Sequence, residues 1–110
     1  MNTGTKMVKE RRTHERFGVT VEVLWHGRNG RSRGTMSDLG PAGCFVLTGA
    51  EVSDGETVHV FLPLGGGMKA QFTGSVTNHE EGIGFGVRFE ELTRQQREVV
   101  ANVIATHPDQ

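Results

Sequence analysis

The sequence has little of several residue types, and each scarcity excludes a class of protein. A single cysteine, Cys44, stands among 110 residues, so no internal disulfide can form, which agrees with a reducing compartment. No apolar run is long enough to cross a bilayer, and the polar, basic N-terminus lacks the apolar core of a signal peptide. We therefore expect a cytoplasmic protein without membrane insertion.

Proline is also scarce, with three residues, whereas glycine is abundant, with 16. A chain of this length fits one domain with a modest core. So much glycine in a short chain indicates many tight turns, or strands that another group approaches closely.

The net charge is only -1, but its distribution is uneven. Residues 1–33 carry eight Lys or Arg and three Glu, whereas the remainder carries four basic and ten acidic residues. A short basic segment on an otherwise acidic chain favours a local anion over the broad basic face of a nucleic-acid binder, so we expect no DNA or RNA partner. A basic tail that is simply solvated explains the charge equally well.

From Val19 onward, apolar and polar residues alternate with a period of two, which is typical of strands with one buried face. Short glycine-containing links separate the strands, and Gly65–Gly67 is predicted to be a hairpin turn. Six short strands of this kind predict an all-β fold, a six-stranded antiparallel barrel that is closed or nearly closed. Cys44–Leu47 is predicted to be a short apolar strand. The residues expected to share the apolar face of the other strands are Val19, Val21, Val23, Trp25, Val58, Val60, Leu62, Met68, Ala70, Phe72, Val76, Ile83, Phe85, Val87 and Phe89.

One C-terminal helix is predicted after the strands. Thr93 is a good N-cap, and Gln96 three residues later completes a capping box. An apolar stripe follows, which must bury against the barrel, and Pro108 prevents continuation. We expect a flexible segment over residues 1–10 and one domain, the barrel with its helix, over residues 11–107.

Features that would indicate an enzyme are weak. The five histidines are scattered, with none at metal-ligand spacing, and Cys44 lies in an apolar strand where a core residue is expected. Leu64–Lys69 lacks the spacing of a phosphate-binding P-loop, and Gly82–Gly86 lacks the context of a dinucleotide site. We therefore expect no catalysis, no metal and no cofactor.

Two segments stand out together, Glu10–Phe17 before the first strand and Ser37–Gly43 after the second. Arg12 and Arg16 stand four residues apart, and arginine presents a planar donor fork that suits phosphate oxygens and the guanine edge. Asp38 is an acceptor that could take two hydrogen bonds from guanine. Each feature alone has a plain explanation, a solvated arginine pair or an aspartate that caps a turn.

In this order and on this strand pattern, the two segments resemble the PilZ family. Its R-x-x-x-R motif corresponds to Arg12–Arg16, preceded by Arg11, and its [D/N]-x-S-x-x-G motif corresponds to Asp38–Gly43. The last strand, Gly84–Phe89, followed by a helix, is also similar to that of the family. The resemblance covers roughly residues 9–106.

The resemblance implies a six-stranded barrel with a C-terminal helix that binds cyclic di-GMP, often as a stacked dimer of the dinucleotide. It assigns phosphates and guanine edges to Arg12 and Arg16, with Arg11 as a lesser candidate, and a guanine to Asp38. Gly43 would shape the turn.

Gly40 departs from the family pattern, because the family has a serine at this position. The loss of one hydroxyl hydrogen bond should cost about 0.5–1.5 kcal/mol, which is roughly a two- to tenfold loss of affinity. The sequence therefore predicts that glycine at position 40 weakens cyclic di-GMP binding but does not abolish it.

Three functions remain open at this stage. The favoured one is a cyclic di-GMP receptor or adaptor, in which the ligand orders the arginine-rich N-terminal segment and an unidentified effector protein recognises the new surface. The alternative is a degenerate PilZ domain that acts as a protein-interaction module without nucleotide binding. A general nucleic-acid-binding barrel is the third, and the acidic remainder of the chain argues against it.

Overall fold

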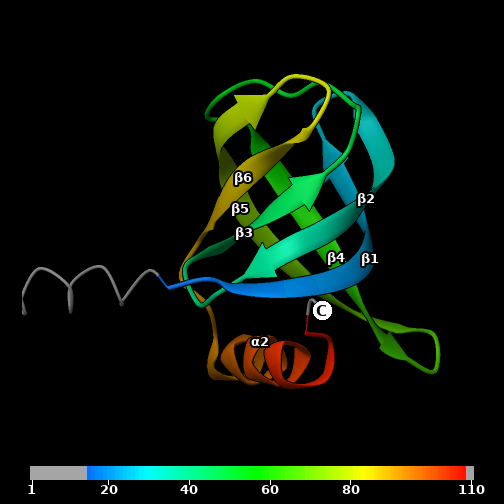
Figure 1. Cartoon of the computed structure of the whole chain (residues 1–110), viewed down its shortest axis with the longest axis vertical. Helices are drawn as coiled ribbons and strands as arrows, with labels where there is room; N and C mark the ends of the chain where they lie inside the picture. The colour runs from blue at the N-terminus through cyan, green and yellow to red at the C-terminus, as the bar shows by residue number, and fades with distance from the viewer. Residues whose placement is uncertain (1–14, 109–110) are drawn as a thin grey trace, which may run out of the picture.

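The computed structural model describes residues 15–108, in which six strands surround a hydrophobic interior and a helix lies against one end (Figure 1). The expected flexible segment 1–10 and the expected start of the domain at residue 11 lie outside the described residues. The elements are β1 (Phe17–Gly27), β2 (Gly30–Leu39), β3 (Gly43–Leu47), β4 (Thr57–Gly65), β5 (Met68–Glu80), β6 (Gly84–Phe89) and α2 (Arg94–Thr106).

The strands form a closed barrel in the order β1-β2-β3-β6-β5-β4, and every neighbouring pair is antiparallel. The predicted six-stranded antiparallel barrel with one C-terminal helix is therefore confirmed. Within residues 15–108, no helix is long and apolar enough to cross a membrane.

Alternating side chains of all six strands fill the barrel interior, as the period of two predicts. Trp25 lies across the interior from Phe85, with ring centroids 4.8 Å apart and an edge-to-face angle of 74°. The core comprises Val19, Val21, Val23, Trp25, Met36, Leu39, Cys44, Val46, Val52, Val58, Val60, Leu62, Phe72, Val76, Phe85, Val87, Phe89, Leu92, Val100 and Val103.

Several side chains expected inside the barrel lie outside it. Met68 is 62% exposed because it begins β5 next to the hairpin turn, and this hairpin projects beyond the barrel (Figure 1). Ile83 is 53% exposed because it lies in the turn that precedes β6. In β3, Phe45 is half-buried and Leu47 is exposed, since the strand alternates and is not buried on both faces.

The helix α2 begins as the sequence predicts. The backbone N–H of Gln96 donates to the Thr93 hydroxyl (3.1 Å), and the Thr93 N–H donates to Gln96 Oε1 (2.8 Å). Val100 and Val103 are buried against the barrel. After the helix, the backbone N–H of Thr20 donates to the carbonyl of His107 (3.2 Å), so the end of the chain is attached to β1.

A buried carboxylate, Glu56, connects two loops at the other end of the barrel. Its Oε2 accepts from the backbone N–H of Arg28 (2.6 Å) in the β1–β2 turn, and its Oε1 accepts from Ser53 N–H (2.9 Å). Burial alone would raise the pKa of Glu56, but these two hydrogen bonds and the charge of Arg28 outweigh it, so the pKa lies below its ordinary value of 4.5.

Replacement of Glu56 by Gln should destabilise the fold. The amide keeps one acceptor but turns an N–H₂ group toward a backbone N–H, which costs about 1–3 kcal/mol of unfolding free energy near neutral pH. Because the folded pKa is depressed, the carboxylate stabilises above the unfolded pKa, and this contribution is lost as the pH falls through the folded pKa. Urea denaturation at about pH 7 and about pH 3.5 should show the difference from wild type narrowing in acid. Glu51→Gln, at an exposed position, is the control and should leave stability unchanged at both pH values.

Candidate functional site

Arg16 and Asp38 come together where the first strand begins and the second ends. Pairing of β1 with β2 sets Phe17 opposite Leu39 and Gly18 opposite Asp38, so Arg16, one residue before β1, lies beside this edge. Its Nη1 lies 2.9 Å from Asp38 Oδ1, and the two side chains are 33% and 35% exposed. The structure therefore joins two residues that the sequence singled out separately, 22 positions apart.

A β-bulge turns Asp38 outward. The β2–β3 register shifts between Met36 and Asp38, so Ser37 is an extra residue in the strand. Because of it, Met36 and Leu39 can both point into the core although they are three positions apart in the strand. Asp38 is left on the outer wall, where a carboxylate stays hydrated and accessible.

The Gly40–Gly43 turn is fixed by backbone hydrogen bonds. Gly40 N–H donates to the carbonyl of Gly43 (2.9 Å), and Phe89 N–H donates to the carbonyl of Ala42 (2.8 Å). A Cβ at position 43 would overlap the carbonyl oxygen of Val87 and would lie 3.0 Å from the Arg16 guanidinium. Glycine at position 43 thus lets the arginine and β6 both approach the turn.

Gly40 has a structural role that the sequence did not reveal. A Cβ at position 40 would overlap the carbonyl oxygen of Glu15 and lie 3.3 Å from the Arg16 Cα. The main chain that leads into β1 therefore passes directly over this glycine. The difference from the family serine is more than a missing hydroxyl, because Glu15 occupies the space in which the serine side chain would start.

Two neighbours of the pair escaped the sequence reasoning. Phe45 is paired with Asp38 across the β2–β3 ladder and is half-buried, with its ring against Gly84 of β6. Arg88 is paired with Gly43 across the β3–β6 ladder and is exposed. Directly paired residues of a ladder face the same side of the sheet. Alternation along β6 could place Arg88 outside, but only the strand order shows that it stands next to the glycine turn.

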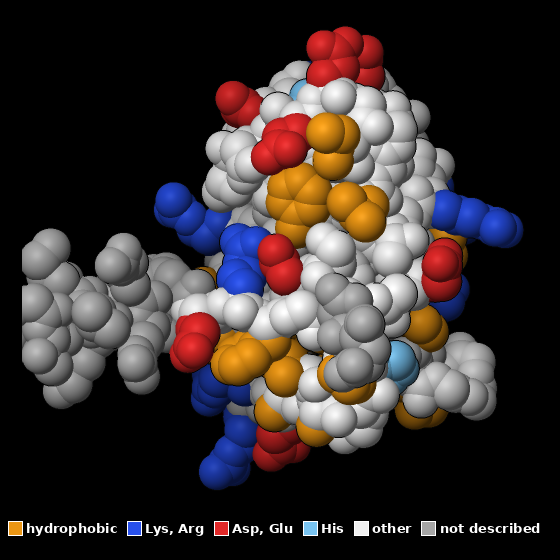
Figure 2. All heavy atoms as spheres, in the orientation of Figure 1, with side chains coloured by type: hydrophobic (Ala, Val, Ile, Leu, Met, Phe, Trp, Pro, Cys, Tyr) orange, Lys and Arg blue, Asp and Glu red, His pale blue; other side chains and the backbone are white. Residues whose placement is uncertain are grey.

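The molecular surface reflects this arrangement. Figure 2 shows hydrophobic side chains gathered over β3 and β6, with basic and acidic side chains side by side below them. Leu47 and Ile83 are exposed hydrophobic residues of this region, and Thr48 N–H donates to the carbonyl of Ile83 (3.0 Å). Leu47 lies on the same face of β3 as Phe45, which is paired with Asp38, so an apolar surface adjoins the charged pair.

The thiol of Cys44 lies in the barrel core, whereas the Arg16–Asp38 pair lies on the outer wall. Cys44 is fully buried, and burial raises the pKa of its thiol to about 12, although the nearby positive charge of Arg16 acts in the opposite direction. The thiol is therefore neutral and a core residue, as its apolar strand indicates. Within residues 15–108, no three His, Cys, Asp or Glu side chains are grouped to hold a metal ion. The remaining predicted site residues, Arg11 and Arg12, lie outside the described part of the chain.

Fold and site together define a class, the small closed β-barrels with an arginine–aspartate pair on the outer wall. The PilZ domain matches residues 10–106 of the sequence. The chain therefore belongs to the PilZ domain family.

Solved structures of the same fold agree with this assignment. The PilZ domain of CeSA from a cellulose-synthesizing bacterium has a TM-score of 0.62 at 20% identity, over 83% of this chain and 95% of that one. The Borreliella burgdorferi PlzA protein in complex with c-di-GMP has a TM-score of 0.68 at 11% identity, over 92% of this chain and 44% of that one. The Bacillus subtilis inhibitor of motility, MotI/DgrA, has a TM-score of 0.60 at 12% identity, over 82% and 47%. No curated protein matches the sequence.

Replacement of Gly40 by Ala tests the close approach of Glu15. The added methyl group must displace the main chain before β1, so we expect about 1–3 kcal/mol of destabilisation in urea. Amide chemical shifts of Phe17 and Gly18 should also change. Gly49→Ala is the matched control, because a Cβ there meets open space. Equal stability of the two variants would contradict the packing described for Gly40.

Proposed function

We propose that the chain is a cyclic di-GMP receptor without catalytic activity, which binds the dinucleotide at the outer wall beside the Gly40–Gly43 turn. The observation that carries the proposal is the ion pair of Arg16 with Asp38, which unites the arginine and aspartate motifs of the PilZ family at one edge. The structural neighbour PlzA, solved in complex with c-di-GMP, supports this ligand.

The geometry of the pair suits an anionic guanine nucleotide. One of the five donors of Arg16 is used by Asp38 Oδ1, which leaves the others for phosphate oxygens. The second carboxylate oxygen of Asp38 can accept from a guanine N–H group. Because a half-exposed ion pair contributes at most about 1 kcal/mol to stability, ligand groups can rearrange it at little cost.

Neighbouring side chains extend the proposed site. Phe45 offers apolar surface beside Asp38, where the flat face of a base can pack. Arg88 adds a second cation beside the glycine turn. By the family motif, Arg11 and Arg12 would reach the phosphates from the N-terminal side.

In this proposal, signalling proceeds through the segment that precedes β1. Ligand binding would order the arginine-rich residues against the barrel, and an effector protein, unidentified so far, would recognise the resulting surface. The free energy for this ordering is the difference in ligand affinity between the open and closed forms.

One observation favours a second candidate, a PilZ domain that binds a protein and no nucleotide. The Glu15 carbonyl fills the space above Gly40 where the family has a serine. If ligand binding needs that space, the segment must move first, and the free energy of moving it lowers the apparent affinity.

Calorimetric titration with cyclic di-GMP tests the receptor directly, with Arg16→Ala as the diagnostic variant. The variant loses charge-assisted hydrogen bonds to the ligand, which contribute about 1.5–3 kcal/mol of binding free energy. Its affinity for cyclic di-GMP should therefore be roughly 10- to 100-fold lower. Arg94→Ala, which removes an exposed arginine of α2, is the control and should bind like wild type. Full affinity of Arg16→Ala would remove this residue from the site. Absence of wild-type binding at roughly millimolar ligand would favour the protein-interaction module.

Asp38→Asn should lower guanine selectivity. The variant presents an amide N–H₂ group where guanine N1–H requires an acceptor, so cyclic di-GMP affinity should fall about tenfold while any weak affinity for cyclic di-AMP changes little. Competition titrations with the two dinucleotides measure this ratio. Asp54→Asn, in an exposed turn, serves as the control. An unchanged ratio for Asp38→Asn would mean that another group recognises the base.

A further inference from the structure

The barrel wall opens where β1 and β4 separate. These strands are joined by three residue pairs, Leu24–Phe61, Trp25–Val60 and His26–His59. In the same register the next residues would be Val21–Val23 and Leu62–Leu64, but no pairing continues there in the described chain. Proline at position 63 has no backbone N–H to donate, and it is typical of the end of strand pairing.

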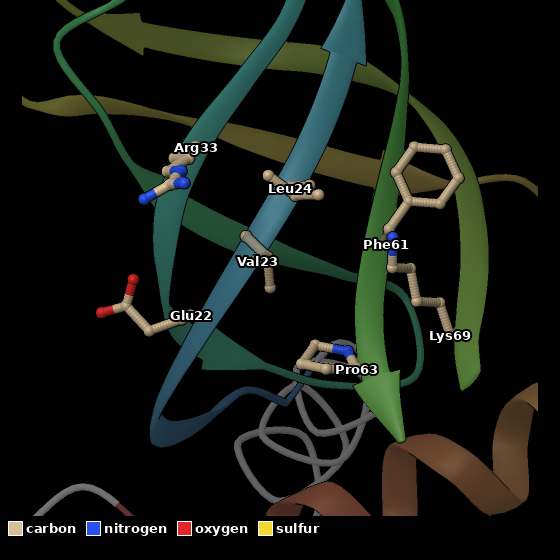
Figure 3. Close-up of a pocket in the computed structure, with 7 residues that line it drawn as sticks. All are labelled: Glu22, Val23, Leu24, Arg33, Phe61, Pro63 and Lys69. Carbon is tan, nitrogen blue, oxygen red and sulfur yellow. The ribbon is translucent and has the colours of Figure 1, made fainter. Parts of the chain in front are cut away.

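A cavity of about 290 Å³ lies at this opening, which we call the wall notch (Figure 3). Its lining residues are Glu22, Val23, Leu24, Arg33, Phe61, Pro63 and Lys69. Leu24, Phe61 and Pro63 form an apolar floor on the outside of β1 and β4. Leu24 and Phe61 are half-buried and Pro63 is exposed, so a partner can reach this surface.

Cations flank the apolar floor. Arg33 is paired with Leu24 across β1 and β2, and Lys69 is paired with Pro63 across β4 and β5, so they stand on opposite sides of the wall notch. Arg31 lines an adjoining hollow of about 150 Å³ together with Leu24, Phe61 and Lys69. All three cations are exposed. Within residues 15–108, the ion pair that forms is that of Arg16 with Asp38. No carboxylate of this part of the chain lies within 4.0 Å of the nitrogen atoms of Arg31, Arg33 or Lys69.

Residues 107 and 108 already pair with the edge of β1 next to the wall notch. Val19 forms an antiparallel bridge with Pro108, and Thr20 N–H donates to the carbonyl of His107. In this antiparallel register His107 stands opposite Thr20, and Thr106, the last residue of α2, stands opposite Val21. Among the described residues, Glu22 and Val23 beside the cavity are therefore left without a partner on this edge of β1.

We propose that the wall notch docks an extended acidic segment of a partner protein. Its backbone would pair with the edge of β1 at Glu22–Val23, as in other strand additions. Its apolar side chains would cover Leu24 and Phe61, and its carboxylates would meet the flanking Arg and Lys side chains. An acidic partner follows from charge complementarity, since three cations and the single carboxylate of Glu22 surround the apolar floor.

Other occupants fit the charges less well. The chain's own residues 1–14 carry four Lys or Arg and one Glu, so they have the same sign as the wall notch. A single-stranded nucleic acid would need several stacking aromatics, whereas the lining supplies Phe61 alone and adds the acidic Glu22.

Fluorescence anisotropy with a labelled peptide Asp-Val-Asp-Ile-Glu-Val-Asp tests the proposal on the full chain. We expect saturable binding that weakens with added salt and weakens about tenfold or more in the double variant Arg33→Glu, Lys69→Glu. The same peptide with alternate amides N-methylated cannot pair with a strand edge and should bind at least about tenfold more weakly. Arg94→Glu, Arg97→Glu reverses two charges on α2 and should bind as wild type does.

Several results would overturn the proposal. These are no saturable binding of the peptide, equal affinity for a version with Lys in place of Asp and Glu, or full affinity of the Arg33→Glu, Lys69→Glu variant with circular dichroism showing it folded. If the chain bound an oligothymidine more tightly than the peptide, the occupant of the wall notch would be a nucleic acid and not an acidic protein segment. The wall notch does not include Arg16 or Asp38, so cyclic di-GMP titration of the same variants tests the proposed receptor separately.

Discussion

Closure of the barrel depends on a short seam between the first and fourth strands. Three residue pairs join β1 to β4, and the middle one places Trp25 beside Val60 while its indole packs on Phe85 inside the barrel. Besides the three backbone pairs, the Trp25 ring thus connects the seam with β6 on the far side of the interior. The other five ladders are longer, so this seam is the shortest junction of the barrel wall, and the wall notch lies at its end.

The candidate site depends on a second constraint, the close passage of the chain before β1 over the glycine turn. Backbone atoms of Glu15 contact Gly40, and the Arg16 guanidinium lies beside Gly43. The turn is held in place from β6 through the hydrogen bond between Phe89 and Ala42. The Arg16 guanidinium is thereby held at a defined position, although the ion pair itself contributes little stability.

The sequence predicted the parts of the structure that local signals determine. Alternation of apolar residues specifies strands, and Thr93 with Gln96 specifies where the helix begins, since both depend on neighbours along the chain. The bulge at Ser37 and the contact of Glu15 with Gly40 depend on residues that are distant in sequence. So do the neighbours of Asp38, because β3 pairs with β6 and not with β4, which brings Arg88 next to Gly43. Met68 and Ile83 follow the alternation but lie beyond the ends of the barrel, which periodicity alone does not reveal.

The two proposed binding surfaces share one strand. Arg16 stands just before β1, and the free edge at Glu22–Val23 lies on the same strand, with a register irregularity between Gly18 and Val21 separating them. The irregularity interrupts the regular β1–β2 ladder between the two surfaces. Coupling between the two surfaces would require that the segment between Gly18 and Val21 has two conformations, and that each ligand binds one of them more tightly than the other. The coupling free energy would then be the same in both directions. Cyclic di-GMP would change the affinity for the peptide by the same factor by which the peptide changes the affinity for cyclic di-GMP.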